Sequence, residues 1–138
     1  MTARNRSRAV ADELRAFALS LPEAREEFPW GERVIKVRKK VFVFLGMPDA
    51  PGVTLSVKLP ESGDVALSLP HTEPTGYGLG RAGWVSARFP PEETPPPSLL
   101  REWILESYRA VAPAKLAATV APSSEPAPRK PPRRRPPP

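Results

Sequence analysis

The chain has 138 residues, enough for one domain with a single hydrophobic core, and a formal net charge of +6 at pH 7. It contains no cysteine, which excludes both a disulfide framework and a thiolate metal site. No apolar run approaches the length that crosses a bilayer, so we expect a cytoplasmic protein without a membrane partner.

The first predicted element is a helix over residues 7–20. Apolar side chains recur there at the spacing of one helical face, and they are Val10, Leu14, Phe17 and Leu21. Ser7 is a candidate N-cap, and Pro22 ends the helix because the residue before a proline disfavours helical backbone. Residues 1–6 are then expected to be a flexible, basic start.

From residue 33 the apolar pattern changes to alternation, which is typical of half-buried strands. Five segments have this character: 33–38, 41–45, 53–59, 65–69 and 84–89. The connections are short and contain Pro, Gly, Asp or Ser, so an antiparallel meander is favoured. The first turn falls at Arg38-Lys39, which contains neither Gly nor Asn, and we expect Lys39 to adopt a left-handed conformation.

A second helical pattern follows the last strand. Its buried face is carried by Leu100, Trp103, Ile104, Ser107, Tyr108 and Val111. Ser98 is a candidate N-cap, and Pro113 separates this helix from a short final one. Together the elements predict an α+β domain, in which an N-terminal helix and C-terminal helices cover one face of an antiparallel sheet of about five strands.

The end of the chain differs in composition from the rest. Residues 119–138 carry a net charge of +4 and residues 1–8 carry +3, which leaves −1 for the residues between them. Eight of the 21 prolines lie in the last 17 positions. With few side chains to bury, residues 119–138 are expected to be a disordered, Pro/Arg-rich basic tail, and residues 1–118 form the domain.

Several short motifs stand in a characteristic order over residues 8–118. They are Leu21-Pro22-Glu23, Trp30-Gly31, Lys40-x-Phe42, Lys58, Trp84 and Ser107-Tyr108. As a set they resemble the MmcQ/YjbR family of small bacterial proteins. The resemblance implies a CyaY-like, frataxin-type fold and DNA binding through a two-winged arrangement of sheet loops. This chain departs from the pattern at Lys39, where relatives often carry Gly, and at Gly83, where they often carry His.

Cations are the main candidates for a binding surface. In the predicted sheet and its loops, Arg33, Lys36, Arg38, Lys39, Lys40, Lys58 and Arg81 would contact phosphates, and in the tail the candidates are Arg129, Lys130, Arg133, Arg134 and Arg135. Lys40 and Lys58 belong to the motifs and would converge on adjacent strands. In the other interpretation, Lys36 and Arg38 lie on the solvated face of an edge strand, where charge prevents edge-to-edge pairing.

Two tryptophans are candidates for stacking on nucleic-acid bases. Trp30 and Trp84 stand next to predicted strands, and aromatic side chains there can stack on exposed bases. The alternative is that they close the hydrophobic core, which is the commoner role of a strand-end aromatic residue.

Catalytic and metal sites find little support in the sequence. His71 is the only histidine and lies between prolines, and Glu23, Glu26 and Glu27 are interrupted by Arg25. The glycines of residues 76–83 lack the spacing of a dinucleotide-binding motif. We therefore expect no catalytic residue, no bound metal and no cofactor.

The resulting hypothesis is weak, sequence-nonspecific binding of DNA or another polyanion through backbone phosphates. No element resembles a recognition helix, so base readout is not expected. The alternative is a protein-interaction module that uses the sheet face or the proline-rich tail. An enzyme is the least supported class, and the sequence does not indicate an oligomeric state.

Overall fold

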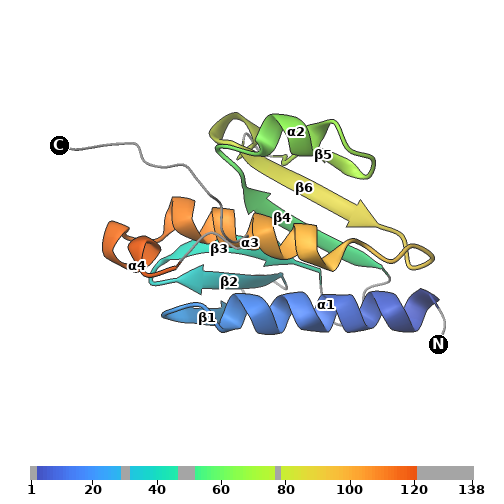
Figure 1. The fold of residues 1–138 in the computed structure, drawn as a ribbon, viewed down its shortest axis with the longest axis horizontal. Coiled ribbons are helices and arrows are strands. Elements are labelled where there is room, and N and C mark those ends of the chain that lie inside the picture. The colour runs from blue at the N-terminus through green and yellow to red at the C-terminus, as the bar shows by residue number, and fades with distance from the viewer. Residues whose placement is uncertain (1–2, 29–31, 47–51, 77–78, 121–138) are drawn as a thin grey trace.

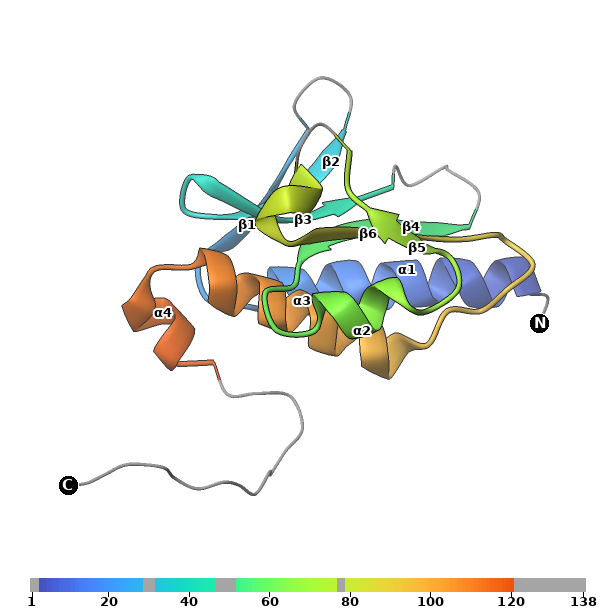
Figure 2. The ribbon, with the colours of Figure 1, turned by 90° about the horizontal axis from the view of Figure 1, so that it is seen from above.

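The computed structural model describes residues 3–28, 32–46, 52–76 and 79–120. They form an α+β fold of two layers, with helices on one face of an antiparallel sheet (Figures 1 and 2). In chain order the elements are α1 (Ala3–Leu19), β1 (Ala24–Glu27), β2 (Arg33–Val37), β3 (Lys40–Leu45), β4 (Val53–Lys58), α2 (Gly63–Leu67), β5 (Thr72–Pro74), the 3-10 helix η2 (Leu79–Ala82), β6 (Trp84–Phe89), α3 (Pro97–Val111) and α4 (Ala114–Ala118).

The strands form one sheet with the order β1-β2-β3-β4-β6-β5. Every neighbouring pair is antiparallel. The predicted fold class is therefore confirmed, but the described residues contain six strands where about five were expected. None of the helices in this described part has the length and apolar character needed to cross a lipid bilayer.

The hydrophobic core lies between the sheet and the two long helices. Leu14 of α1 and Ile104 of α3 are fully buried against sheet residues such as Ile35 and Val57. Alternation along β4 is regular, with Val53, Leu55 and Val57 buried and the residues between them half-exposed. This is the pattern expected of a strand with one covered and one open face.

The register of β2 on β3 shifts between Ile35 and Lys36. Ile35 lies opposite Val43 and Lys36 lies opposite Val41, so Phe42 is an extra residue on β3. Phe42 and Val43 are both fully buried, as expected where a β-bulge turns two successive side chains toward one side.

Helix α1 begins earlier than predicted. It starts at Ala3, so the expected helix start at residue 7 and the expected cap at Ser7 are wrong. Ser7 is instead a buried residue within the helix, and its hydroxyl donates to the carbonyl oxygens of Pro91 (3.3 Å) and Glu93 (2.9 Å). These bonds attach the turn after β6 to α1.

The predicted strand at 65–69 is wrong. Residues 63–67 form the helix α2, in which Ala66 is buried. A long-range contact holds the turn before this helix: the Glu106 carboxylate on α3 accepts from the backbone N–H groups of Glu61 (2.8 Å) and Ser62 (3.0 Å) and from the Ser62 hydroxyl (2.6 Å). The carboxylate thus fixes the two residues that lead into α2, and its negative charge near the helix start is favourable.

The turn between β2 and β3 lies where it was predicted, but a different residue carries the strain. Arg38, not Lys39, has a positive φ of 58°. Glu23 also has a positive φ of 62°, and its carboxylate accepts two hydrogen bonds from the Arg38 guanidinium, at 2.9 Å and 3.2 Å. A side-chain ion pair thus links two turns whose backbone is unfavourable for non-glycine residues.

Candidate functional site

One end of the sheet brings several candidate cations together. Val37 pairs with Lys40 across the β2–β3 turn, and Lys58, the last residue of β4, pairs with Trp84, the first residue of β6. We call this end, formed by the β2–β3 turn, the end of β4 and the η2–β6 junction, the turn end of the sheet. It contains Lys36, Arg38, Lys39, Lys40, Lys58 and Arg81.

Salt bridges divide these cations into two groups. Lys36 pairs with Glu27 at 3.0 Å, and Arg38 pairs with Glu23 at 2.9 Å. The pKa of Glu27 is lowered mainly by its hydrogen bond from Arg25 and next by that from Lys36, so the carboxylate stays ionised and compensates their charge. The hydrogen bond from Arg38 likewise lowers the pKa of the exposed Glu23 carboxylate. This carboxylate therefore stays ionised and compensates the charge of Arg38.

The second group consists of cations without such a partner. Among the residues that the structure describes, no salt bridge involves Lys39, Lys40, Lys58 or Arg81. They come from the turn, from β3, from β4 and from η2. The positive charge of the turn end that is free to meet an anion is therefore carried by these four side chains.

Lys40 and Lys58 lie on adjacent strands, as predicted, but on opposite faces. Lys58 shares the open face with its partner Trp84, whereas Lys40 is opposite Val37, whose side chain lies on the face covered by the helices. A single ligand that contacts both lysines must therefore pass around the end of the sheet.

Arg33 does not join these cations. It is buried at the other end of β2, and its Nε has no hydrogen-bond partner among the described residues. Burial is the main cause that lowers its pKa, and the charge of Glu26 acts in the opposite direction. The predicted inclusion of Arg33 in an exposed basic patch is wrong, because the residue is buried.

The open face of the sheet carries an aromatic pair beside Lys58. The rings of Trp84 and Phe44 meet edge-on, with centroids 5.5 Å apart and an interplanar angle of 68°. Trp84 is only 8% exposed, so stacking on a base would require this side chain to leave its contact with Phe44. Base stacking by Trp84 stays a prediction, and Trp30 lies outside the described residues.

Three hydroxyl groups form a chain on the same face. The Ser86 hydroxyl lies 2.7 Å from that of Ser56 and 2.9 Å from that of Thr75. Ser56 is two residues before Lys58 and therefore shares its face of β4. This face thus presents a lysine, hydroxyl groups and an aromatic edge, which are groups that can contact a polar ligand.

The motif residues of α3 hold the turn end in place. The Ser107 hydroxyl donates to the Phe42 carbonyl (2.5 Å) and accepts from the Lys58 backbone N–H (2.8 Å). The Tyr108 hydroxyl donates to the Pro22 carbonyl (2.7 Å), and its ring meets that of Phe42 edge-on at 5.1 Å. Sequence reasoning placed both residues on the buried face of the helix but missed these bonds, for which the sequence carries no local signal.

The remaining acidic and histidine candidates are engaged in pairs. Glu26 forms two 2.7 Å hydrogen bonds with Arg15, and these lower its pKa. His71 Nε2 lies 2.8 Å from a carboxylate oxygen of Glu93. Across the described ranges, no three His, Asp or Glu side chains are grouped so that they could hold a metal ion.

The tail candidates Arg129, Lys130, Arg133, Arg134 and Arg135 lie outside the described residues. Their point of attachment is nevertheless described, because α4 ends at Ala118 and the chain is described to Val120. Figures 1 and 2 place α4 and the β2–β3 turn at the same end of the molecule, opposite the start of α1. The described chain thus ends near the turn end.

Comparisons with known proteins relate this chain to a protein family and to a solved structure. A family model described as YjbR matches residues 19–110. The structure is also similar to the crystal structure of the Deinococcus radiodurans protein DR2400, which has the family-model domain DUF419; the chains are 29% identical, the match covers 72% of this chain and 75% of that chain, and the TM-score is 0.59. No curated protein sequence matches this chain.

Proposed function

The chain belongs to the YjbR family, and from the geometry of its turn end we propose that it binds the phosphate backbone of DNA weakly and without sequence specificity. The observation that supports this proposal is the group of four cations without salt-bridge partners in the described structure, Lys39, Lys40, Lys58 and Arg81. The attachment of the basic tail at the same end adds further charge.

The physical basis is the release of counterions. Each phosphate that a lysine or arginine neutralises contributes about −0.9 to the slope of log affinity against log salt concentration. Four such contacts would lower the affinity roughly 100-fold between 50 and 200 mM salt. Lys36 and Arg38 are expected to contribute less, because each would first have to leave a carboxylate.

Fluorescence anisotropy with a labelled DNA duplex at a series of salt concentrations tests the proposal. We compare the full chain with two double variants, Lys39→Gln/Lys40→Gln and Lys36→Gln/Arg38→Gln. Both variants remove two positive charges from the same hairpin. They differ only in whether the removed charges take part in salt bridges. The unpaired double variant is expected to lose more affinity and to have a slope about 2 units shallower.

Two results would contradict the proposal. An unmodified chain that does not bind the duplex at 50 mM salt, or binds with no dependence on salt, lacks the proposed function. Equal losses in the two double variants would mean that net charge alone governs binding, and the assignment to the unpaired lysines would then be wrong.

A further inference from the structure

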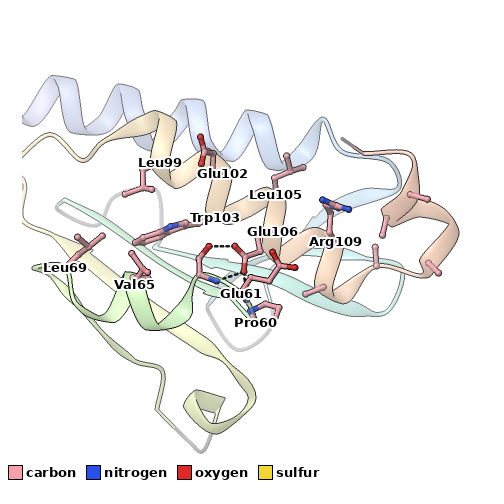
Figure 3. Close-up of a pocket in the computed structure, with 17 residues that line it drawn as sticks. Pro60, Glu61, Val65, Leu69, Leu99, Glu102, Trp103, Leu105, Glu106 and Arg109 are labelled. Carbon is pink, nitrogen blue, oxygen red and sulfur yellow. Dashed lines mark hydrogen bonds between the residues drawn. The ribbon is translucent and has the colours of Figure 1, made fainter. Parts of the chain in front are cut away.

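A groove lies on the helical side of the molecule, between α2, α3 and α4. Its volume is ≈ 870 Å³, and its wall includes residues from the start of α2, one side of α3 and the alanines of α4. Figure 3 shows Val65, Leu69 and Trp103 gathered in one part of the groove, with Glu61 and Glu106 between them and Arg109. The groove therefore has an apolar part and an acidic part.

The apolar part is unusually open to solvent. Val65 is 69% exposed and Leu69 is 36% exposed, although both lie beside the largely buried Trp103. Large apolar side chains that stay exposed next to one another are typical of a surface that another segment covers. Prolines suit such a surface, because they are apolar and lose little conformational freedom on binding.

The acidic part has charge available for a ligand. Glu106 is committed to the start of α2 through three hydrogen bonds. The carboxylates of Glu61 and Glu102 form no salt bridge within the described chain, and the lining contains one cation, Arg109. The lining as a whole therefore attracts a basic ligand.

The chain itself supplies a segment with these properties at this place. Ala114, Ala117 and Ala118 of α4 line the groove, and the segment 121–138 follows α4 after two more residues. This segment contains eight prolines, and its five cations stand against one acid. An extended chain of 18 residues spans up to about 55 Å, so reach does not limit where it can bind.

We propose that the groove between α2, α3 and α4 is the docking site for the chain's own C-terminal segment, residues 121–138. The prolines contact Val65, Leu69 and Trp103, and two of the segment's five cations pair with Glu61 and Glu102, which leaves three cations for a phosphate backbone. This docking does not depend on nucleic-acid binding. Because it is intramolecular, weak contacts suffice, since the tether supplies an effective concentration in the millimolar range.

Paramagnetic NMR on the full chain tests the proposal. The sequence has no cysteine, so Ala127→Cys provides the only thiol for a nitroxide label. We expect broadening of the amide signals of Val65 and Leu69 and of the Trp103 indole. The amide signals of Ser56, on the open face, and of Gly76 are expected to stay sharp.

Two further labelled variants separate the groove charges from net charge. Glu61→Gln/Glu102→Gln removes two acids from the groove and is expected to reduce the broadening at least about threefold, because each lost pair weakens the docking. Glu32→Gln/Glu92→Gln removes two exposed acids elsewhere that have no salt bridge in the described chain and is expected to leave the broadening unchanged.

Equal broadening on the helical and open faces would overturn the proposal. So would equal effects of the two double variants. Broadening that arises only between separate molecules, measured by mixing isotope-labelled chain with nitroxide-labelled chain, would assign the groove to the tail of a second copy and would also overturn intramolecular docking.

Discussion

Replacement of Ser107 by Ala tests how the turn end is held together. Ser107 is fully buried, and its hydroxyl joins the Phe42 carbonyl on β3 to the Lys58 backbone N–H on β4. The two strands pair directly only as far as Val43 and Val57, so the hydroxyl takes over where the strand pairing stops. No other side chain of the described structure makes this link.

The cost of Ser107→Ala follows from these two bonds. The substitution removes one oxygen atom and leaves almost no cavity, but it leaves one buried carbonyl and one N–H group without that partner. Each unsatisfied buried group costs about 1–3 kcal/mol, so for the two groups we expect a loss of roughly 2–6 kcal/mol. This is a large part of the 5–15 kcal/mol that is typical of a domain, in order of magnitude.

Urea unfolding measures this loss directly. The matched control is Ser68→Ala, whose exposed hydroxyl donates to the Val65 carbonyl at 2.6 Å, and it is expected to cost about 0.5 kcal/mol or less. An unchanged slope of the unfolding free energy against urea concentration would show that the unfolding transition itself is the same. If the losses in the two variants agree within about 0.5 kcal/mol, the role assigned to Ser107 is wrong.

Other substitutions test neighbouring features of the fold and the tail. Tyr108→Phe removes the hydrogen bond to the Pro22 carbonyl and is expected to cost about 0.5–1.5 kcal/mol in urea unfolding. Arg38→Gly is expected to be about 1 kcal/mol more stable than Arg38→Ala, because only glycine accepts the positive φ without strain; equal stabilities would contradict this. Arg15 lowers the Glu26 pKa, so the stability gained from this pair is present above the ordinary value of 4.5 and lost as pH falls through the lowered pKa. Unfolding free energies measured from pH 6 down to pH 2 should therefore decrease less in Glu26→Gln than in the unmodified chain, and parallel curves would refute this. Changing the five cations of residues 129–135 to Gln should make the salt slope of DNA binding shallower, and an unchanged slope would exclude the tail from that surface.

Long periodic segments determined what the sequence could predict of the fold. The helical spacing of Leu100, Ile104 and Tyr108 and the alternation in 53–58 lead directly to α3 and β4. The missed strands β1 and β5 are short, and β1 has the sequence AREE. Such edge strands carry little apolar patterning, so local sequence gives no signal for them.

The wrong prediction at 65–69 has a different cause. Val65, Leu67 and Leu69 alternate as in a strand with one buried face, and Val65 is nevertheless highly exposed on α2. The two residues that lead into α2 are held by the carboxylate of Glu106, which is more than 40 positions away from them in the sequence. Contacts of this kind override local preference, and a single sequence does not reveal them.

The prediction of the candidate site was limited because strand β1 was not predicted. Glu27 lies in β1, and Arg25 of β1 pairs in register with Lys36 of β2. Without β1 in the predicted sheet, nothing indicated that an acid would stand beside Lys36. Sequence reasoning therefore grouped the cations of the hairpin as equivalent, whereas the structure shows paired and unpaired ones.

The motifs that carry the family resemblance have a structural role here that does not depend on a ligand. Phe42, Ser107 and Tyr108 are buried in one connected network, and it includes the backbone of Lys58. Lys40 is two residues before Phe42 on β3, so the network fixes the backbone on which both motif lysines stand. Lys39, in contrast, lies exposed in the turn. If phosphate binding depends on a fixed spacing between Lys40 and Lys58, loosening the network at Ser107 should weaken it even though no charge is removed. If it depends on charge density alone, Ser107→Ala should bind DNA as the unmodified chain does under conditions where both are folded.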